Sequence, residues 1–280
     1  MGSEPSTPAA PVASGRESSG RASACARPGP DVVPAHAVIF VRHGRTAYNA
    51  EHRLQGQVDI PLDAVGLWQA ARTGEALRER YGRPQPLVQG PLPPPGVSMD
   101  AAPRRFGQVV ISSDLGRSLQ TAHAFADPLG LSVHAEPGVR ERSFGDWDGE
   151  LVEELNRRDP AGFAECIFAA GGLPAVHDES KAEVGERGAA AVERWARTVG
   201  PDNDLFVFSH GACIVQTVLT LMGLGGAGRA FEEMTSLRNA HWCRMVPTRH
   251  ADGSLVWRLS EYNVGPAVAE QVDWNNPPID

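Results

Sequence analysis

The sequence contains one lysine, four cysteines and no long apolar run. Lys181 stands alone among 26 lysine and arginine residues, so arginine carries nearly all of the positive charge. Arginine is suited to the bidentate recognition of carboxylates and phosphates. A GC-rich coding bias that favours arginine codons would produce the same composition, and composition alone leaves both explanations open.

The acidic balance and the scattered cysteines exclude several classes of protein. A net charge of -8 argues against a general nucleic-acid-binding protein, because such proteins need a basic surface to displace counterions from phosphates. The cysteines show no CxxC spacing, as is typical of thiols in a reducing compartment; they are Cys25, Cys166, Cys213 and Cys243. No apolar stretch approaches the roughly 18 residues of a membrane span or forms the apolar core of a secretory signal. We therefore expect a cytoplasmic protein without a membrane segment.

Two segments lack hydrophobic periodicity. Residues 1–34 are rich in Ser, Ala, Pro, Gly and Arg, and we interpret them as a disordered tail. An organelle-targeting peptide is the alternative, which Glu4, Glu17 and the prolines disfavour. Residues 83–106 contain too many prolines for a helix or a central strand and predict a surface insertion. The rest of 35–280 is predicted to form one domain.

Short apolar segments alternate with helical patterns along that domain. AVIFV (37–41), QVVIS (108–112) and DLFVF (204–208) predict strands that are buried on both faces, and 131–135 predicts a shorter one. The predicted helices lie at 63–81, 115–126, 150–157, 161–169, 181–198 and 212–222. HWCRMVP and SLVWRLSEY, which flank a turn at 251–253, predict a pair of strands. We expect an α/β fold: a mostly parallel central sheet flanked by helices on both faces, in a three-layer sandwich.

Each of the three buried strands is followed by residues that are suited to binding an anion. The strands lead into RHG (42–44), SDLGR (113–117) and SHG (209–211). Because ligands bind at the carboxyl ends of strands in open parallel sheets, two histidines and two arginines would converge if these strands are neighbours. Arg117 is predicted in the first turn of a helix, where the helix dipole disfavours a cation. That position favours an anion-binding role over a solvated one.

These motifs, in this order, resemble the histidine phosphatase superfamily, the phosphoglycerate mutase-like proteins. RHGRTAYN (42–49) is similar to the family's RHG segment, and SSDLGRSLQTA (112–122) to its SSxLxRxxQTA. VRERSFGDWDG (139–149) is similar to its acid-bearing LxExxxGxWxG segment. SHGACI (209–214) supplies a second histidine, although the family more often has Gly at the position of Ala212. The resemblance extends from about residue 37 to the C-terminus and leaves the tail and the insertion unexplained.

The resemblance implies a metal-independent phosphomonoester hydrolase that acts through a phosphohistidine on a small phosphorylated metabolite. His43 is then the nucleophile, which splits one hard step into two. Arg42, Arg117 and His210 neutralise the phosphoryl group, whose charge spreads over equatorial oxygens in the transition state. Glu141 is then the general acid and base. No cofactor is implied.

Some of these assignments rest on family spacing alone. Glu136, Asp146 and Asp148 lie close to Glu141 in sequence, so the residues themselves do not single out the acid. The resemblance also implies three residues that line the phosphate or substrate site: Asn49, Gln55 and Gly56.

Two other kinds of site are disfavoured by spacing. The nine histidines show no HxH or HExxH pattern, and a crevice rich in arginine repels metal ions, so no metal is expected. The residues 223–228 satisfy the dinucleotide-binding pattern GxGxxG, but they follow a helical run and not a strand. They predict a helix C-terminus and a loop.

Alternative functions stay open within the same family. A phosphoglycerate mutase would return the phosphoryl group to its substrate, but RERSFGDWDGE (140–150) is closer to the phosphatase form than to the mutase form ERxYGxLQG. The lysine-bearing segments of mutases cannot be matched with Lys181 alone. A non-catalytic member that binds a phosphorylated ligand or a protein would keep the same motifs. The ending NAHW (239–242) followed by LVWRLSEYN (255–263) resembles that of glucosyl-3-phosphoglycerate phosphatases, which makes that compound one substrate hypothesis beside other sugar phosphates. The sequence leaves a homodimer open.

Overall fold

The computed structural model describes Gly2 and residues 33–82, 106–168, 172–225, 234–249 and 254–279. The chain divides into two units, residues 1–30 and 31–280, and every element below belongs to the second. Nearly all of the predicted tail and insertion lies outside the described residues, as do residues 226–228 of the glycine-rich motif and the turn at 251–253. Those interpretations stay predictions.

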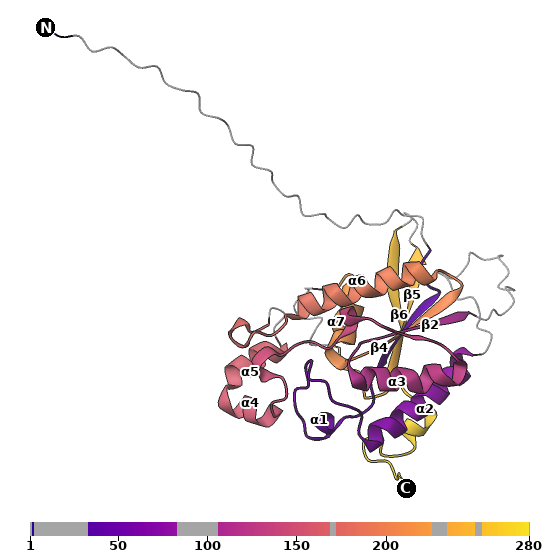
Figure 1. Ribbon diagram of the computed structural model, residues 1–280, viewed down its shortest axis with the longest axis horizontal. Helices are drawn as coiled ribbons and strands as arrows, with labels where there is room; N and C mark the ends of the chain where they lie inside the picture. The colour runs from indigo at the N-terminus through magenta and orange to yellow at the C-terminus, as the bar shows by residue number, and fades with distance from the viewer. Residues whose placement is uncertain are drawn as a thin grey trace. The chain divides into compact units, whose positions relative to one another are not determined.

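A six-stranded sheet forms the centre of the second unit (Figure 1). Its strands are β1 (Ala37–Arg42), β2 (Gly107–Ser112), β3 (Val133–Ala135), β4 (Asn203–Ser209), β5 (Trp242–Arg249) and β6 (Leu255–Val264). The order is β3-β2-β4-β1-β5-β6. The first four in this order are parallel, whereas β5 and β6 run antiparallel to their neighbours. The predicted mostly parallel sheet and the C-terminal strand pair are confirmed.

The helices follow the predicted ranges closely. They are α1 (Ala47–Ala50), α2 (Ala64–Tyr81), α3 (Gly116–Ala126), α4 (Val152–Arg158), α5 (Pro160–Phe168), α6 (Lys181–Val199) and α7 (Gly211–Leu221). The sequence did not predict α1, a single turn that begins with a capping box between Thr46 and Asn49. The predicted helix end in the glycine-rich motif agrees with α7, which ends at Leu221.

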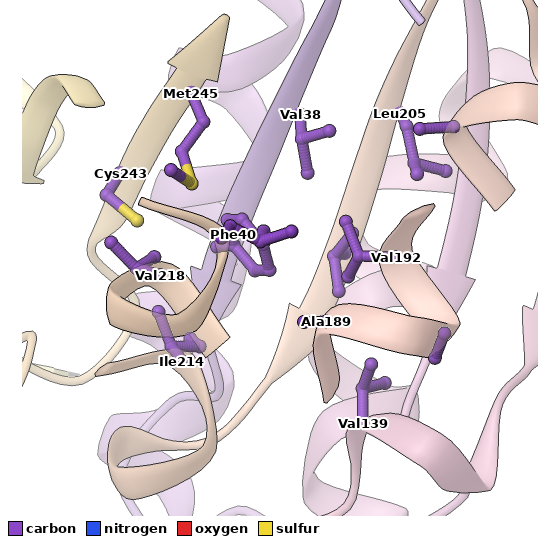
Figure 2. Packing of buried hydrophobic residues seen from close by; sticks show 14 of the residues in the cluster. Val38, Phe40, Val139, Ala189, Val192, Leu205, Ile214, Val218, Cys243 and Met245 are labelled. Carbon is purple, nitrogen blue, oxygen red and sulfur yellow. The ribbon is translucent and has the colours of Figure 1, made fainter. Parts of the chain in front are cut away.

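Helices cover both faces of the sheet (Figure 1), and the side chains of β1 alternate between them. Ala37, Ile39 and Val41 pack in the core on the side of α2 and α3. Val38 and Phe40 point to the other face, where they meet side chains of α6 and α7 (Figure 2). This alternation follows from the two-residue period of a strand. It confirms the three-layer sandwich.

The register of the sheet places the ends of three strands together. Arg42 at the end of β1 pairs with Ser209 of β4, and Ser112 at the end of β2 pairs with Phe208 of β4. The loops that follow β1, β2 and β4 therefore leave the sheet at one edge. The three loops carry the residues that the sequence analysis singled out.

Trp242 and Trp257 are buried in the C-terminal strands. The described cysteines are free and buried; they are Cys166, Cys213 and Cys243. Within the described residues, no helix is both long enough and apolar enough to cross a membrane.

Candidate active site

Two histidines from different loops lie side by side at this edge of the sheet. The backbone N–H of His43 donates to the carbonyl oxygen of Ser209 at 3.0 Å, which joins the loop after β1 to the end of β4. The ring centroids of His43 and His210 are 5.1 Å apart, with an angle of 56° between the planes. Both rings are almost completely buried.

The hydrogen bonds of His43 leave one ring nitrogen available as a nucleophile. Its Nδ1 lies 2.7 Å from the carbonyl oxygen of Gly44. A carbonyl can only accept, so Nδ1 carries the proton and Nε2 keeps its lone pair. Burial, followed by the charges of Arg117 and Arg42, lowers the pKa of His43 well below 6.5. The imidazole is therefore neutral, as a nucleophile must be.

Three nitrogen atoms around this histidine have no hydrogen-bond partner among the described residues. They are Nε of Arg42, Nε of Arg117 and Nδ1 of His210, and all three are buried. An unsatisfied buried donor costs about 1–3 kcal/mol. Because the two arginines and the two histidines perturb one another's pKa, these atoms belong to one small region. A tetrahedral oxyanion would satisfy several such donors at once.

Both arginines are held by backbone carbonyl groups. Arg117 donates from Nη1 to the oxygen of Val58 at 2.8 Å and from Nη2 to the oxygen of Gly56 at 2.9 Å. Arg42 donates from Nη1 to the oxygen of Leu237 at 2.5 Å. Carbonyl groups fix the orientation of a guanidinium without cancelling its charge. Both cations can therefore attract an anion.

The orientation of His210 follows from a serine in the loop after β2. His210 Nε2 lies 2.8 Å from Ser113 Oγ, and that oxygen accepts a hydrogen bond from the N–H of Leu115 at 3.3 Å. The hydroxyl proton can then be donated to Nε2, which places the ring proton on Nδ1. Burial is the main cause that lowers the pKa of His210 well below 6.5. The neutral ring thus presents an N–H donor from Nδ1.

The side chain of Glu141 lies at the N-terminus of α7. This helix begins directly after His210. The Oε1 of Glu141 accepts hydrogen bonds from the N–H groups of Arg142 and Cys213, both at 2.9 Å. Its Oε2 accepts from the N–H of Ala212 at 3.2 Å. The residue is 9% exposed and lines a pocket of about 860 Å³ together with Arg42. A carboxyl group beside the candidate phosphoryl site can exchange protons with a substrate in that pocket.

The three other carboxyl groups near Glu141 in sequence are engaged elsewhere. Glu136 accepts a hydrogen bond from the indole of Trp195, and Asp146 pairs with the exposed ring of His177. Asp148 accepts from the backbone N–H groups of Gln57 and Phe144. The geometry therefore favours Glu141 among the alternatives that the sequence left open.

The structure gives the three implied binding residues different places. The Oδ1 of Asn49 accepts from the side chain of Asn239 at 3.2 Å, and Asn49 lines a second pocket of about 450 Å³ that also includes Arg42. Gln55 is buried and accepts from the hydroxyl of Thr46. Gly56 has φ +50, and a Cβ there would lie 1.6 Å from an oxygen of Asp148. The carbonyl oxygen of Gly56 accepts a hydrogen bond from Arg117, so Gly56 helps to orient that guanidinium group.

Several supporting residues carry no role in the sequence analysis. Arg187 of α6 donates to the carbonyl oxygens of Arg140 and Glu141, both at 2.9 Å, and pairs with Glu179. The side chain of Asn239 donates to the carbonyl oxygen of His43 at 3.1 Å. Thr121 accepts from the N–H of Gly44 at 3.1 Å. Thr121 stands inside the matched QTA motif, but no local pattern marks the other two.

Gly44 allows a close approach between the loop after β1 and the start of α2. A Cβ at this position would lie 2.4 Å from the carbonyl oxygen of Gly66. The loop after β1 and the start of α2 therefore approach one another more closely than a side chain would allow.

The comparison with known families agrees with this geometry. A model described as "Histidine phosphatase superfamily (branch 1)" matches residues 38–92 and 99–260. This chain belongs to the histidine phosphatase superfamily. The match includes every motif on which the site is built, and the family assignment made from the motifs is confirmed.

Two curated histidine phosphatase superfamily relatives and one solved structure show the range of similar proteins. "Glucosyl-3-phosphoglycerate phosphatase" of Mycolicibacterium vanbaalenii is 29% identical over 84% of this chain and 97% of its own length. "Probable phosphoglycerate mutase GpmB" of Yersinia enterocolitica is 32% identical over 67% of this chain and 75% of its own length. A structure of the mycobacterial glucosyl-3-phosphoglycerate phosphatase Rv2419c with VO3 matches with a TM-score of 0.66 and 26% identity, covering 82% of this chain and 100% of that one.

In the described part of this histidine phosphatase, no three His, Cys, Asp or Glu side chains are grouped so that they could hold a metal ion. The cations at the site are arginines.

Replacing His43 by glutamine tests the neutral state of the imidazole. In the unfolded chain the ring binds a proton below about pH 6.5, whereas the buried ring, whose pKa is lowered, does not. The wild-type free energy of unfolding should therefore fall as the pH is lowered from about 7 to 5. His43→Gln should reduce that slope by up to about 1.4 kcal/mol per pH unit. Urea unfolding at several pH values measures both slopes, and equal slopes would contradict a neutral His43.

Proposed function

We propose that this chain hydrolyses small phosphomonoesters through a covalent phosphohistidine at His43, without a metal ion. The observation that carries the proposal is the neutral His43 beside three buried N–H donors that have no partner among the described residues. Those donors belong to Arg42, Arg117 and His210. Together they offer a nucleophile and the charge complement of a phosphoryl group at one edge of the sheet. The family membership supports the same function.

In the first step Nε2 of His43 attacks phosphorus while the ester P–O bond breaks. The equatorial oxygens carry the developing charge, and they receive hydrogen bonds from Arg42, Arg117 and His210. The leaving oxygen takes a proton from Glu141. The product is a phosphoimidazolium whose Nδ1 proton stays bonded to the carbonyl oxygen of Gly44.

Glu141 must hold a proton before this step. The N–H groups of Ala212 and Cys213 at the start of α7, together with that of Arg142, hold its carboxyl group in place.

In the second step a water molecule attacks the phosphohistidine. Glu141, now a carboxylate, accepts the proton of the water as the new P–O bond forms. The P–N bond breaks, its electron pair returns to Nε2 of His43, and phosphate leaves. The neutral imidazole and a protonated carboxyl group are restored, so that the cycle begins again.

The release of p-nitrophenol from p-nitrophenyl phosphate tests this function. The wild-type protein should turn the compound over at an unchanged rate in EDTA, because the cations at the site are side chains. His43→Ala should lower the rate by a factor of roughly a thousand or more, since removal of a nucleophile abolishes the covalent route. His123→Ala removes an exposed histidine whose side chain is 51% accessible and should leave the rate unchanged.

Three outcomes of that assay would contradict the proposal. An inactive wild type across a panel of phosphoesters would favour a non-catalytic, ligand-binding member of the family. Loss of activity in EDTA would remove the metal-free mechanism. An unchanged rate for His43→Ala would remove the nucleophile.

We propose glucosyl-3-phosphoglycerate as the first specific substrate to examine. Relatives that bear that name match 84% and 85% of this chain, and the C-terminal pattern at 239–242 and 255–263 supports the same choice. The value of kcat/KM for this compound should exceed those for glucose 6-phosphate and p-nitrophenyl phosphate by at least about tenfold, since an extra charge-assisted contact contributes about 1.5–3 kcal/mol. Phosphate release measures it. Turnover of p-nitrophenyl phosphate without any release from glucosyl-3-phosphoglycerate would exclude this substrate alone.

A phosphoglycerate mutase activity is the second candidate function for this chain, because one relative is named as a probable phosphoglycerate mutase. Incubation with 3-phosphoglycerate separates the two reactions, because a mutase yields 2-phosphoglycerate and a phosphatase yields phosphate. We expect phosphate.

A further inference from the structure

The position of Glu141 identifies the pocket that receives the alcohol part of a substrate. An in-line displacement places the leaving oxygen opposite to the attacking nitrogen, so the proton donor stands on the leaving-group side. Arg42 lines both pockets of the site. Glu141 lines the larger one, of about 860 Å³, but not the smaller one. The alcohol part therefore lies in the larger pocket; this step rests on the proposed function.

The larger pocket combines apolar walls with a few charged groups. Its apolar lining includes Phe144, Ile167, Val215 and Met234. Its charged lining consists of Arg42, Glu141, Arg142 and Lys181 among the described residues. Arg42 and Glu141 serve the phosphoryl group and the proton transfer. Two further cations line the pocket, Arg142 and Lys181.

Arg142 is committed to the fold. Its guanidinium donates to the carbonyl oxygens of Glu179 at 2.6 Å and Cys166 at 2.8 Å. It also forms an ion pair with Asp178 at 2.5 Å, in which both side chains are at most 2% exposed. A buried ion pair of this kind neutralises its own charge. Arg142 therefore stabilises the wall of the pocket, and we assign it no contact with the substrate.

Lys181 has the properties of a recognition residue. It is the only lysine of the chain, it is 8% exposed, and it lines the same pocket as Glu141. It is the first residue of α6, where the helix dipole disfavours a cation, so helix stability does not explain its place. A lysine can lay its apolar stem along an apolar wall while its ammonium group reaches a polar partner.

We propose that Lys181 binds an anionic group on the alcohol part of the substrate. The substrate class is then a phosphomonoester whose alcohol carries a second negative charge, either a carboxylate or another phosphate. The phosphoryl group lies with Arg42, Arg117 and His210, and the second anion lies across the pocket with Lys181. The apolar side chains between them contact the carbon skeleton.

A matched pair of substrates tests this assignment. 3-Phosphoglycerate and glycerol 3-phosphate differ in whether the far end of a three-carbon chain is a carboxylate or a hydroxymethyl group. The wild-type kcat/KM should be higher for 3-phosphoglycerate. Lys181→Met should lower it by about 10- to 100-fold for that compound, the loss expected when a charge-assisted hydrogen bond is removed. It should change the values for glycerol 3-phosphate and p-nitrophenyl phosphate by less than about twofold. Glycerol 1,3-bisphosphate, measured in the same way, distinguishes a second phosphate from a carboxylate.

Three further variants separate the effect of the Lys181 charge from a general loss of stability or of positive charge. Lys181→Arg keeps the charge and should retain part of the preference, and Lys181→Gln serves if the methionine variant fails to fold. Arg197→Met removes a cation from the last turn of the same helix, where it pairs with Glu193, and should change none of the values.

Two results would overturn the proposal. One is a wild-type protein that does not distinguish 3-phosphoglycerate or glycerol 1,3-bisphosphate from glycerol 3-phosphate. The other is a lysine variant in which the rates for all substrates fall by the same factor. Either result leaves turnover of p-nitrophenyl phosphate intact in the wild type, so the proposed function would stand while the role of Lys181 would fall.

Discussion

Arginine side chains that are anchored by backbone carbonyl groups beside a neutral imidazole are the constraint on which the site depends. Arg42 and Arg117 are anchored by carbonyl oxygens, whereas arginines such as Arg142 and Arg187 pair with carboxylates. Only the first kind of anchor leaves the charge available to an anion. The same charges, with burial, keep His43 unprotonated. A phosphate ester is the ligand that makes use of both properties, because it needs cations to neutralise it and a lone pair to attack it.

The fold builds this cluster from segments that are far apart in the sequence. Parallel pairing of β1 with β4 and of β4 with β2 brings the loops after three strands to one edge. Close backbone contacts complete it: Gly44 lies against Gly66, and a Cβ on Gly211 would lie 3.4 Å from the guanidinium carbon of Arg42. The start of α7 then holds Glu141 by its N–H groups. Substitutions at these glycines would move the charged groups that carry the chemistry.

The sequence predicted the layers, the parallel strands and the motif residues, because apolar runs and short motifs are local signals. It did not separate Glu141 from Asp148, since four carboxyl groups lie close together in sequence and only the packing against α7 distinguishes them. It also missed Arg187 and Asn239. Asn239 contacts a residue 196 positions away and Arg187 one 46 positions away, and no local pattern records such contacts.

The central claim is that phosphoryl transfer passes through His43, and trapping the intermediate tests it most directly. The wild-type protein is mixed with a phosphomonoester for a fraction of a turnover, quenched in alkali, digested and analysed by mass spectrometry. The account predicts a phosphoryl group on the peptide that contains His43, stable in alkali and lost in acid, and absent from His43→Ala. A phosphoryl group on another residue, or full turnover by His43→Ala, would contradict it.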